Sequence, residues 1–496
     1  MQAQCSVQGA TIRGVEAVPV SVEVSVGTGM PGFSIVGMPD AAIQEARERV
    51  RAAVKACGFR MPADKVVVNL APGSLKKSGS GFDLPIALGI LAATRQIDAS
   101  LIEGSLCVGE LSLEGELRAV KGMLAFELCA RNQGLSLVCA QPEDGLIELE
   151  GLVCRTAASL SSFRRGSFGV PVTQVRHDTA AVLDFSDVSG HEAAKRALQV
   201  AAAGGHGVLM MGPPGSGKTM LASRLPSILP PLTESEKVET ALVHSVAGED
   251  IGPILAGKRP FRKPHHSASM AGLVGGGTPP RPGEISLATG GVLFLDEFPE
   301  FKPSVLQAIR QPIESGRIAV TRAEGSVVFP ARFMLVAASN PCPCGYFGDT
   351  GERCSCTAAQ IRTYQGRIGG PLMDRIDIHI DVWRASFDMV LGGGAGTASE
   401  VLRKGVMEAR EFASWRKEQN RGMPAERSII AACSLEEDDE EFLKDMAALH
   451  RMSGRGIVKT LSIARTIADM DGREKVGRAQ VCEALGLRLR DGIGAV

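Results

Sequence analysis

The chain has 496 residues, long enough for about three domains, and its 44% hydrophobic and 22% charged content is typical of a globular protein. Its formal net charge of −1 excludes a general electrostatic attraction to nucleic acid, so any basic surface must be local. No apolar run approaches the roughly 18 residues of a membrane span, and Met1–Ser6 lacks the features of a signal peptide, so we expect a cytoplasmic protein with no membrane partner.

Residues 1–165 alternate β-branched runs with helix-like segments. Strands are predicted at Val18–Val26 and Lys65–Leu70, and helices at Ala41–Cys57 and Leu84–Ala93. Together these segments predict an α+β domain.

One part of this domain resembles the proteolytic domain of Lon-type proteases, a family that uses a Ser/Lys dyad. The resemblance lies in Lys76–Pro85 and in Gly109–Leu111. The position that matches the nucleophile is Gly81, and the segment around Leu124 contains no matching lysine. The resemblance therefore implies a Lon-protease-like domain that is degenerate.

Ser80 with Lys76 or Lys77 is an alternative dyad. No base is identifiable for this serine, which favours a glycine-rich loop that carries a structural serine. We expect an accessory domain without proteolytic activity. Residues 166–185 are polar and weakly patterned, and they predict a linker to a second domain at 186–385.

The run Gly-Pro-Pro-Gly-Ser-Gly-Lys-Thr follows the apolar strand Val208–Met211 and precedes a helix-like segment from Met220 to Leu225. In this context the pattern predicts a phosphate-binding loop, because its glycines let backbone N–H groups surround a polyphosphate at a helix N-terminus. The lysine reaches the β- and γ-phosphates and the threonine binds Mg²⁺, so we predict ATP and Mg²⁺ as cofactors. The loop residues are Gly212, Pro213, Pro214, Gly215, Ser216, Gly217, Lys218 and Thr219.

A second apolar strand, Gly291–Leu295, ends in Asp296 and Glu297. Parallel strands present their carboxyl ends to the ligand, so both acids should lie beside the phosphates. Asp296 is predicted to hold Mg²⁺ through its water shell, and Glu297 to orient the attacking water. A third strand, from Arg332, ends in Asn340, an amide that could touch the γ-phosphate, although asparagine here is usually a turn former.

Arg375 directly precedes another predicted strand, Ile376–Val382. In a ring, such an arginine can enter the neighbouring subunit's site and stabilise charge in the transition state. The alternative is an ion pair within the subunit, with Asp374 or Asp377.

Several further motifs are uncommon outside one family: Arg259-Pro-Phe-Arg-Lys-Pro-His-His266, Leu273-Val-Gly-Gly-Gly277, Pro280-Arg-Pro-Gly-Glu-Ile-Ser-Leu287 and Asn340-Pro-Cys-Pro-Cys-Gly345. With the phosphate loop they make nearly the whole chain resemble the ComM (YifB) family of Mg-chelatase-like AAA+ ATPases. The resemblance implies an α/β fold, in which an AAA+ P-loop core with a parallel sheet carries a C-terminal helical lid. It also implies a homo-hexameric ring with ATP sites between subunits and, for the competence members, a DNA helicase that promotes branch migration during transformation.

In AAA+ ATPases the segment before the phosphate loop borders the adenine, and here this segment is Asp184–Glu192. It leads into a predicted helix over Ala193–Ala203, with Asp187 or Ser189 as the N-cap. An ordinary capped helix needs no nucleotide, so both interpretations stay open.

The family places an insertion at about 257–282 and a β-hairpin before Asn340. Gly316–Arg322 and Ser326–Pro330 predict that hairpin. Such loops would point into the pore of the ring, where basic side chains could contact DNA phosphates without reading bases. Solvated loop charge is the alternative. The candidates are Arg259, Arg262, Lys263, His265, His266 and Arg322.

Two short turns bring four cysteines close in sequence: Cys342, Cys344, Cys354 and Cys356. Tetrahedral Zn²⁺ takes four such soft ligands, and a cytoplasmic chain rarely clusters cysteines for disulfides. The spacing predicts a structural zinc site, with redox-active or unligated thiols as alternatives.

Residues 386–398 are glycine-rich and predict a flexible joint. Beyond it, residues 399–496 are rich in helix formers, and Ile457, Leu461 and Ala464 follow helical spacing, as expected of the lid. Arg455 matches the sensor-arginine position of the family, which would contact the γ-phosphate of its own or a neighbouring subunit.

The residues and the resemblance together predict a Mg²⁺-dependent, ring-forming ATPase that moves single-stranded or branched DNA. One alternative is a protein-remodelling ATPase of the Mg-chelatase type, whose client is another protein. A third possibility is a nucleotide-gated scaffold. DNA-stimulated hydrolysis with steep salt dependence would separate the first from the other two.

Overall fold

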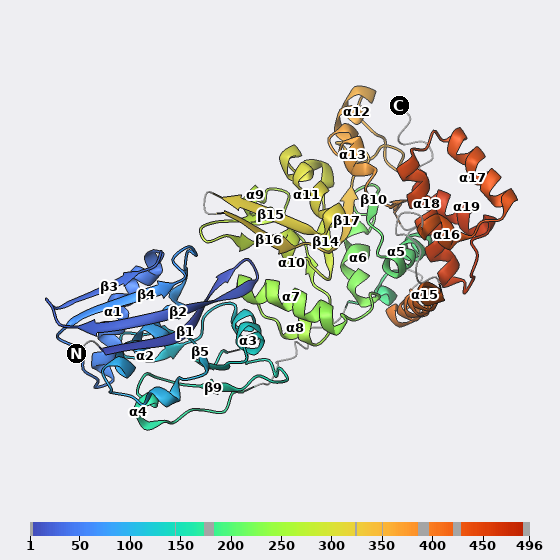
Figure 1. Ribbon diagram of the computed structural model, residues 1–496. Helices are drawn as coiled ribbons and strands as arrows, with labels where there is room; N and C mark the ends of the chain where they lie inside the picture. The colour runs from blue at the N-terminus through green and yellow to red at the C-terminus, as the bar shows by residue number, and fades with distance from the viewer. Residues whose placement is uncertain are drawn as a thin grey trace.

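The computed structural model describes residues 3–143, 145–172, 183–322, 325–349, 351–384, 396–419 and 428–489. These residues form an N-terminal domain, a central domain and a C-terminal group of helices, which follow one another along the molecule (Figure 1). The first two parts pack through α3 (Met123–Asn132) and α7 (Glu234–Ala247), where Leu124 joins an apolar cluster with Leu232, Ala241 and Ile254. The predicted linkers, 166–185 and 386–398, lie partly outside the described residues.

One mixed sheet dominates the N-terminal domain. Its strands are β1 (Ala3–Arg13), β2 (Glu16–Gly27), β3 (Gly32–Val36), β4 (Lys65–Ala71), β5 (Ser105–Val108), β8 (Ser136–Cys139) and β9 (Cys154–Thr156), beside a small pair, β6 (Glu110–Leu111) and β7 (Leu117–Arg118). Besides α3, the helices are α1 (Ala41–Ala56), α2 (Asp83–Ala93) and α4 (Ser162–Arg165). The sheet order is β3-β4-β2-β1-β5-β8-β9, and both predicted strands and both predicted helices are confirmed.

The loop of the possible Ser/Lys dyad holds a buried lysine. The ammonium of Lys77 donates to the carbonyl oxygens of Gly37 and Pro72, and burial lowers the pKa of Lys77 below its ordinary value. An ammonium committed to two backbone carbonyls is not a free base for Ser80. This geometry favours the structural interpretation of the loop.

The central domain contains a five-stranded parallel sheet in the order β11-β14-β17-β10-β18. Its strands are β10 (Val208–Met211), β11 (Phe261–Arg262), β14 (Val292–Leu295), β17 (Met334–Ser339) and β18 (Ile378–Asp381). β10, β14 and β17 are buried throughout, because helices or loops cover both faces. Since all five strands run in one direction, their carboxyl ends share one edge of the sheet and their amino ends share the other.

Besides α7, the helices of this domain are α5 (Glu192–Gly204), α6 (Lys218–Arg224), α8 (Gly252–Leu255), α9 (Met270–Val274), α10 (Glu284–Leu287), α11 (Pro303–Ser315), α12 (Ala358–Gly366) and α13 (Gly370–Met373). Two small antiparallel pairs complete it: β12 (Gly275–Gly276) with β13 (Arg281–Pro282), and β15 (Arg317–Arg322) with β16 (Gly325–Pro330). The second pair confirms the predicted hairpin.

Helix α5 begins differently from the prediction. Its N-cap is His191, which has a φ of +62° and makes no side-chain cap hydrogen bond. Gly190 before it also has a positive φ, of +70°, so two left-handed residues turn the chain into the helix. The prediction of Asp187 or Ser189 is wrong, because a side-chain cap requires an extended residue directly before the first helical turn.

The C-terminal helices are α15 (Ser399–Gln419), α16 (Ser428–Cys433), α17 (Glu437–Leu449), α18 (Gly454–Met470) and α19 (Arg478–Arg488). α15 and α18 pack on α5, and α19 contacts β18, so this group covers one end of the central domain (Figure 1). The helical character predicted for this region is confirmed. None of the helices in the described ranges combines the length and the apolar composition that a membrane crossing requires.

Candidate nucleotide site

The predicted phosphate loop joins β10 to α6 at the carboxyl edge of the sheet. Gly215 and Gly217 have φ values of +76° and +86°, a region that favours glycine. Gly212 lies so close to the neighbouring chain that an added Cβ would stand 1.9 Å from the carbonyl oxygen of Val382. The glycines are therefore required by the tight turn and by this close approach, and α6 begins directly at Lys218.

Lys218 is buried inside the loop that precedes it. Its ammonium donates to the carbonyl oxygens of Gly212 at 2.7 Å and Pro213 at 2.8 Å, and it lies 3.4 Å from Oδ1 of Asn340. Burial lowers the pKa of Lys218 to about 8, although the carboxylate of Asp296 acts in the opposite direction. A polyphosphate would offer this ammonium stronger, charged acceptors.

The two acids at the end of β14 lie beside the start of α6. The hydroxyl of Thr219 donates to Oδ2 of Asp296 at 2.9 Å, which brings together the two predicted Mg²⁺ ligands. Glu297 follows with a φ of +52°, a left-handed conformation that is uncommon outside glycine. Backbone strain of this kind is concentrated at functional sites.

Two basic residues that are candidates for contacting DNA lie beside these acids. Nζ of Lys263 lies 2.9 Å from Oδ2 of Asp296, and Nδ1 of His266 lies 3.1 Å from Oε2 of Glu297. The cause is the parallel pairing of β11 with β14, which places the residues after one strand beside those after the other. Lys263 and His266 thus have partners within the chain, and their contact with DNA stays a prediction.

The other DNA-contact candidates fall into two groups. Arg259 pairs with Glu236 at 3.0 Å, and Arg262 pairs with Glu284 at 2.7 Å and with Glu249 at 3.0 Å. Both guanidinium groups therefore have partners inside the chain, and their contact with DNA also stays a prediction. His265 is exposed and shares a 2.7 Å hydrogen bond with the hydroxyl of Ser267. Arg322 ends β15, and its side chain lies outside the described part.

Arg375 and Arg455 meet at the opposite, amino edge of the sheet. Arg375 lies three residues before β18, and its Nε is 3.0 Å from Oε1 of Glu314, near the end of α11. Nη2 of Arg455, in the first turn of α18, is 2.7 Å from the same oxygen. The contact with Arg375 is the main cause that holds the pKa of Glu314 below its ordinary value. The intrasubunit partner of Arg375 is thus Glu314, while Asp377 pairs with Lys459.

The four clustered cysteines converge on one point, with all their sulfur atoms within 4.8 Å of one another. Sγ of Cys342 lies 3.3 Å from Sγ of Cys344 and 3.8 Å from Sγ of Cys354. Tetrahedral zinc with Zn–S bonds of about 2.3 Å requires sulfur separations of about 3.8 Å, so the donor set fits this ion. Burial would raise the pKa of Cys344, but N–H groups of Tyr346 and Ser355 lower it to about 5, whereas burial raises the pKa of Cys354 to about 12.

The cysteine cluster packs against the phosphate loop. An added Cβ on Gly345 would stand 2.6 Å from Cδ of Pro214, so the two turns touch directly. Gln365, on α12, donates to the carbonyl oxygen of Pro341 at 2.9 Å and holds the other side of the turn. The cluster therefore supports both the loop and the strand end that carries Asn340.

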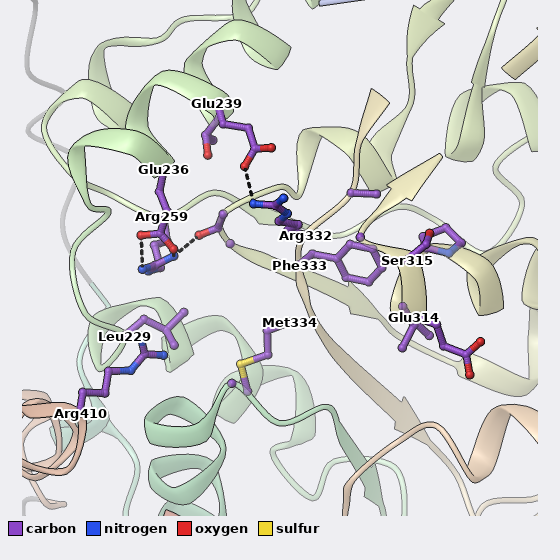
Figure 2. Close-up of a pocket in the computed structure, with 18 residues that line it drawn as sticks. Leu229, Glu236, Glu239, Arg259, Glu314, Ser315, Arg332, Phe333, Met334 and Arg410 are labelled. Carbon is purple, nitrogen blue, oxygen red and sulfur yellow. Dashed lines mark hydrogen bonds and ion pairs between the residues drawn. The ribbon is translucent and has the colours of Figure 1, made fainter. Parts of the chain in front are cut away.

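A cavity of about 510 Å³ lies at the amino edge of the sheet, away from the phosphate loop. Its lining includes residues that directly precede β14 and β17, such as Gly291 and Phe333. Figure 2 shows Arg259 beside Glu236 and Arg332 beside Glu239 in this cavity. These charged groups already have partners within the chain, so we do not assign the nucleotide to this cavity.

Comparison with known proteins gives matches along most of the chain. The family described as "Magnesium chelatase, subunit ChlI" matches residues 184–390, "Subunit ChlI of Mg-chelatase" matches 22–143, and "Magnesium chelatase, subunit ChlI C-terminal" matches 396–488. The chain is 42% identical to Competence protein ComM of Haemophilus influenzae, over 96% of this chain and 95% of that protein. It is 40% identical to the uncharacterized protein YifB of Escherichia coli K12, over 96% of both chains. It is 26% identical to the magnesium-chelatase 38 kDa subunit of Cereibacter sphaeroides, over 62% of this chain and 92% of that protein.

Proposed function

The chain belongs to the ComM/YifB family of Mg-chelatase-like AAA+ proteins, and on this premise we propose that it is a Mg²⁺-dependent, ring-forming ATPase that moves DNA. The observation that carries the proposal is the 2.9 Å contact between Thr219 and Asp296, beside the buried ammonium of Lys218. It joins the phosphate loop to the two acids at one edge of a parallel sheet, where α/β proteins bind their ligands.

Each residue of this edge has a role in the proposed reaction. The backbone N–H groups of Gly215–Thr219 and the ammonium of Lys218 bind the phosphates. Thr219 and Asp296 hold Mg²⁺, which when bound neutralises phosphate charge. Glu297 orients the attacking water, and Asn340 contacts the γ-phosphate or that water.

The ring is supported by the position of the two arginines. β10 separates the two edges of the sheet by four residues, or about 13 Å, so Arg375 and Arg455 are remote from the phosphate loop of their own subunit. We propose that both serve the nucleotide of a neighbouring subunit in a homo-hexamer, where they stabilise charge in the transition state.

DNA is the proposed substrate because the chain is similar along its length to a competence protein, and the resemblance to the ComM family implies helicase activity and branch migration in recombination. Among the DNA-contact candidates, this proposal keeps His265 and Arg322. The similarity to a magnesium-chelatase subunit supports the alternative, an ATPase that remodels a protein client.

We also propose a structural Zn²⁺ held by Cys342, Cys344, Cys354 and Cys356, on the sulfur separations given above. A closed four-cysteine site leaves no position for a substrate, so the ion would brace the phosphate loop and take no part in hydrolysis. Reduced thiols and ATP are both available in the cytoplasm, where we place the activity.

ATP turnover, measured with and without single-stranded, duplex and four-way DNA, tests this function. We expect DNA to raise turnover, and the stimulation to fall steeply between about 50 and 200 mM salt, because binding to phosphates releases counterions. Equal turnover with every DNA structure would contradict the DNA proposal and favour the protein-remodelling alternative. Sizing with ATP should show a hexamer.

Two variants test the ATPase itself. Lys218→Ala should abolish ATP binding, while Glu297→Gln should bind ATP and hydrolyse it at least about 10²-fold more slowly. Lys237→Ala is the matched control, because Lys237 forms an ion pair with the exposed Glu234, at 2.7 Å, and with no other residue in the described ranges. Normal hydrolysis by Glu297→Gln would contradict the assignment of the residue that orients water.

A further inference from the structure

Side chains of the C-terminal helices hold the loop that carries Arg375. We call Arg375–Asp377 the arginine loop; it connects α13 to β18. Nζ of Lys459, on α18, donates to the carbonyl oxygen of Arg375 at 2.7 Å and also pairs with the carboxylate of Asp377. Nη1 of Arg488, at the end of α19, donates to the carbonyl oxygens of Ile376 at 3.1 Å and Asp377 at 3.0 Å. All three carbonyls of the loop are therefore bound by two C-terminal side chains.

The side chains of α18 that contact the central domain lie on one face of this helix. Arg455, Lys459 and Thr466 are spaced by four and seven residues, which places them in one stripe along a helix. Arg455 reaches Glu314, Lys459 reaches the arginine loop, and Thr466 shares a 2.9 Å hydrogen bond with Nε2 of His206. The stripe thus faces the amino edge of the sheet along its length.

The other side of the arginine loop is anchored to the sheet. Oδ2 of Asp377 accepts a hydrogen bond from the N–H of Gly207 at 2.8 Å, and the N–H of Asp377 donates to the carbonyl oxygen of Gly207 at 3.1 Å. Gly207 directly precedes β10, the strand that leads to the phosphate loop. Asp377 is therefore held between the first strand of the nucleotide site and the C-terminal helices.

Burial strengthens these contacts. The side chains of Lys459 and Asp377 are 21% and 18% exposed, and burial lowers the pKa of Arg488 below its ordinary value. Hydrogen bonds from charged groups in such surroundings are stronger than neutral ones. The backbone from Arg375 to Asp377 therefore follows the position of α18 and α19.

We propose that Lys459 and Arg488 are positioning residues, which hold the arginine loop so that Arg375 reaches the nucleotide of the neighbouring subunit. The C-terminal helices of one subunit then control hydrolysis at the next subunit's site. Glu314 completes the arrangement, because it fixes the guanidinium groups of Arg375 and Arg455 on one oxygen. This inference rests on the proposed action of Arg375 across a subunit interface.

Lys459→Met tests the inference, because methionine keeps most of the side-chain volume and removes the charge. We expect kcat to fall about 10- to 100-fold, as for a displaced catalytic group, while the Kd for ATP changes less than about twofold. Lys459→Arg should restore most of kcat, and Arg488→Met should resemble Lys459→Met. Lys475→Met is the control: Lys475 is exposed and, among the described residues, forms an ion pair with Glu436 alone, at 3.4 Å. A wild-type kcat for Lys459→Met would overturn the proposal.

Mixed rings separate positioning from simple structural support. Glu297→Gln subunits cannot hydrolyse ATP but still present an intact arginine loop, so adding them to Lys459→Met subunits should raise total turnover severalfold. Turnover that does not rise would overturn the proposal, because a subunit weakened in its own fold or site gains nothing from an inactive neighbour. In an Arg375→Ala background, Lys459→Met should have no further effect on kcat, since it acts through Arg375.

The single variant Arg375→Ala separates the catalytic role of Arg375 from the positioning role of Lys459. A wild-type kcat for Arg375→Ala would contradict the proposed role of this arginine, and the inference with it. A slow Arg375→Ala together with a normal Lys459→Met would overturn only the positioning role.

Discussion

The two edges of the central sheet contain different functional groups. The carboxyl edge has a phosphate loop, a hydroxyl and a carboxylate 2.9 Å apart, and a second acid in a strained conformation. The amino edge has two arginines that share one glutamate oxygen, at 3.0 Å and 2.7 Å. Our proposal assigns the binding and activation of ATP to the carboxyl edge. It assigns to the arginines of the amino edge the stabilisation of transition-state charge on a neighbouring subunit's nucleotide.

Because the two sets of groups lie at opposite edges, our proposal treats them as two half-sites that face in opposite directions. Four strand residues separate them, and a rigid parallel sheet cannot bring its own edges together. In the ring that we propose, the amino edge of one subunit meets the carboxyl edge of the next. In the single chain, the carboxylate of Glu314 pairs with both arginines and takes the place that a phosphate of the neighbouring subunit's nucleotide would have in the ring.

The largest expected effect tests whether the amino edge takes part in the reaction at all. Arg375→Ala should lower kcat about 10³-fold with little change in ATP binding, because such an arginine stabilises mainly the transition state. Arg367→Ala is the control, since Arg367 is exposed and pairs with Glu300 at 3.2 Å. Mixing with Glu297→Gln subunits should restore part of the turnover, and no recovery would argue against action between subunits.

The second-largest expected effect tests whether the four-cysteine cluster supports the phosphate loop at the carboxyl edge. Replacing Cys344 and Cys354 by serine should remove the zinc and lower both the Tm and kcat, the latter about 10- to 100-fold, since Gly345 would no longer brace Pro214. Cys482→Ser, at an exposed position outside the cluster, should match the wild type. Metal analysis that finds well under one zinc per chain would refute the site.

A third effect concerns pH and belongs to the carboxyl edge alone. Burial lowers the pKa of Lys218 to about 8, and a bound triphosphate should raise it again, since the phosphates favour the ammonium. The Kd for ATP without Mg²⁺ should therefore be constant just below pH 8 and rise about tenfold per unit above it. Calorimetry in buffers of different ionisation enthalpy should show proton uptake on binding at pH 9, and proton release would contradict the assignment.

The smallest expected effect concerns the contact between Lys263 and Asp296. The ammonium of Lys263 competes with Mg²⁺ for Oδ2 of Asp296, so Lys263→Met should lower the Mg²⁺ concentration for half-maximal turnover about fivefold, the size of a partly exposed ion pair. The matched substitution is Lys237→Met. An increase in the Mg²⁺ requirement would show that Lys263 assists the metal site instead.

Local patterns predicted the carboxyl edge well. A glycine-rich run between a strand and a helix, and acids at the end of an apolar strand, describe groups that lie close in sequence and share one edge by the rule for parallel sheets. The cysteine turns and the hairpin were equally accessible, because each depends on a few neighbouring residues. The cap of α5 was mispredicted, because two left-handed residues replaced the extended cap conformation.

The amino acid sequence by itself therefore determined the family, the main elements, the phosphate loop and the convergence of the four cysteines, since these follow from short-range patterns. Only the tertiary structure decided that Lys263 and His266 contact the two acids at the end of β14, because this depends on which strand pairs with β14. The same holds for the amino edge, where Glu314, Arg375, Lys459 and Arg488 come from four separate segments of the chain. These contacts of the amino edge join residues more than 60 positions apart in the chain, and no local pattern encodes them.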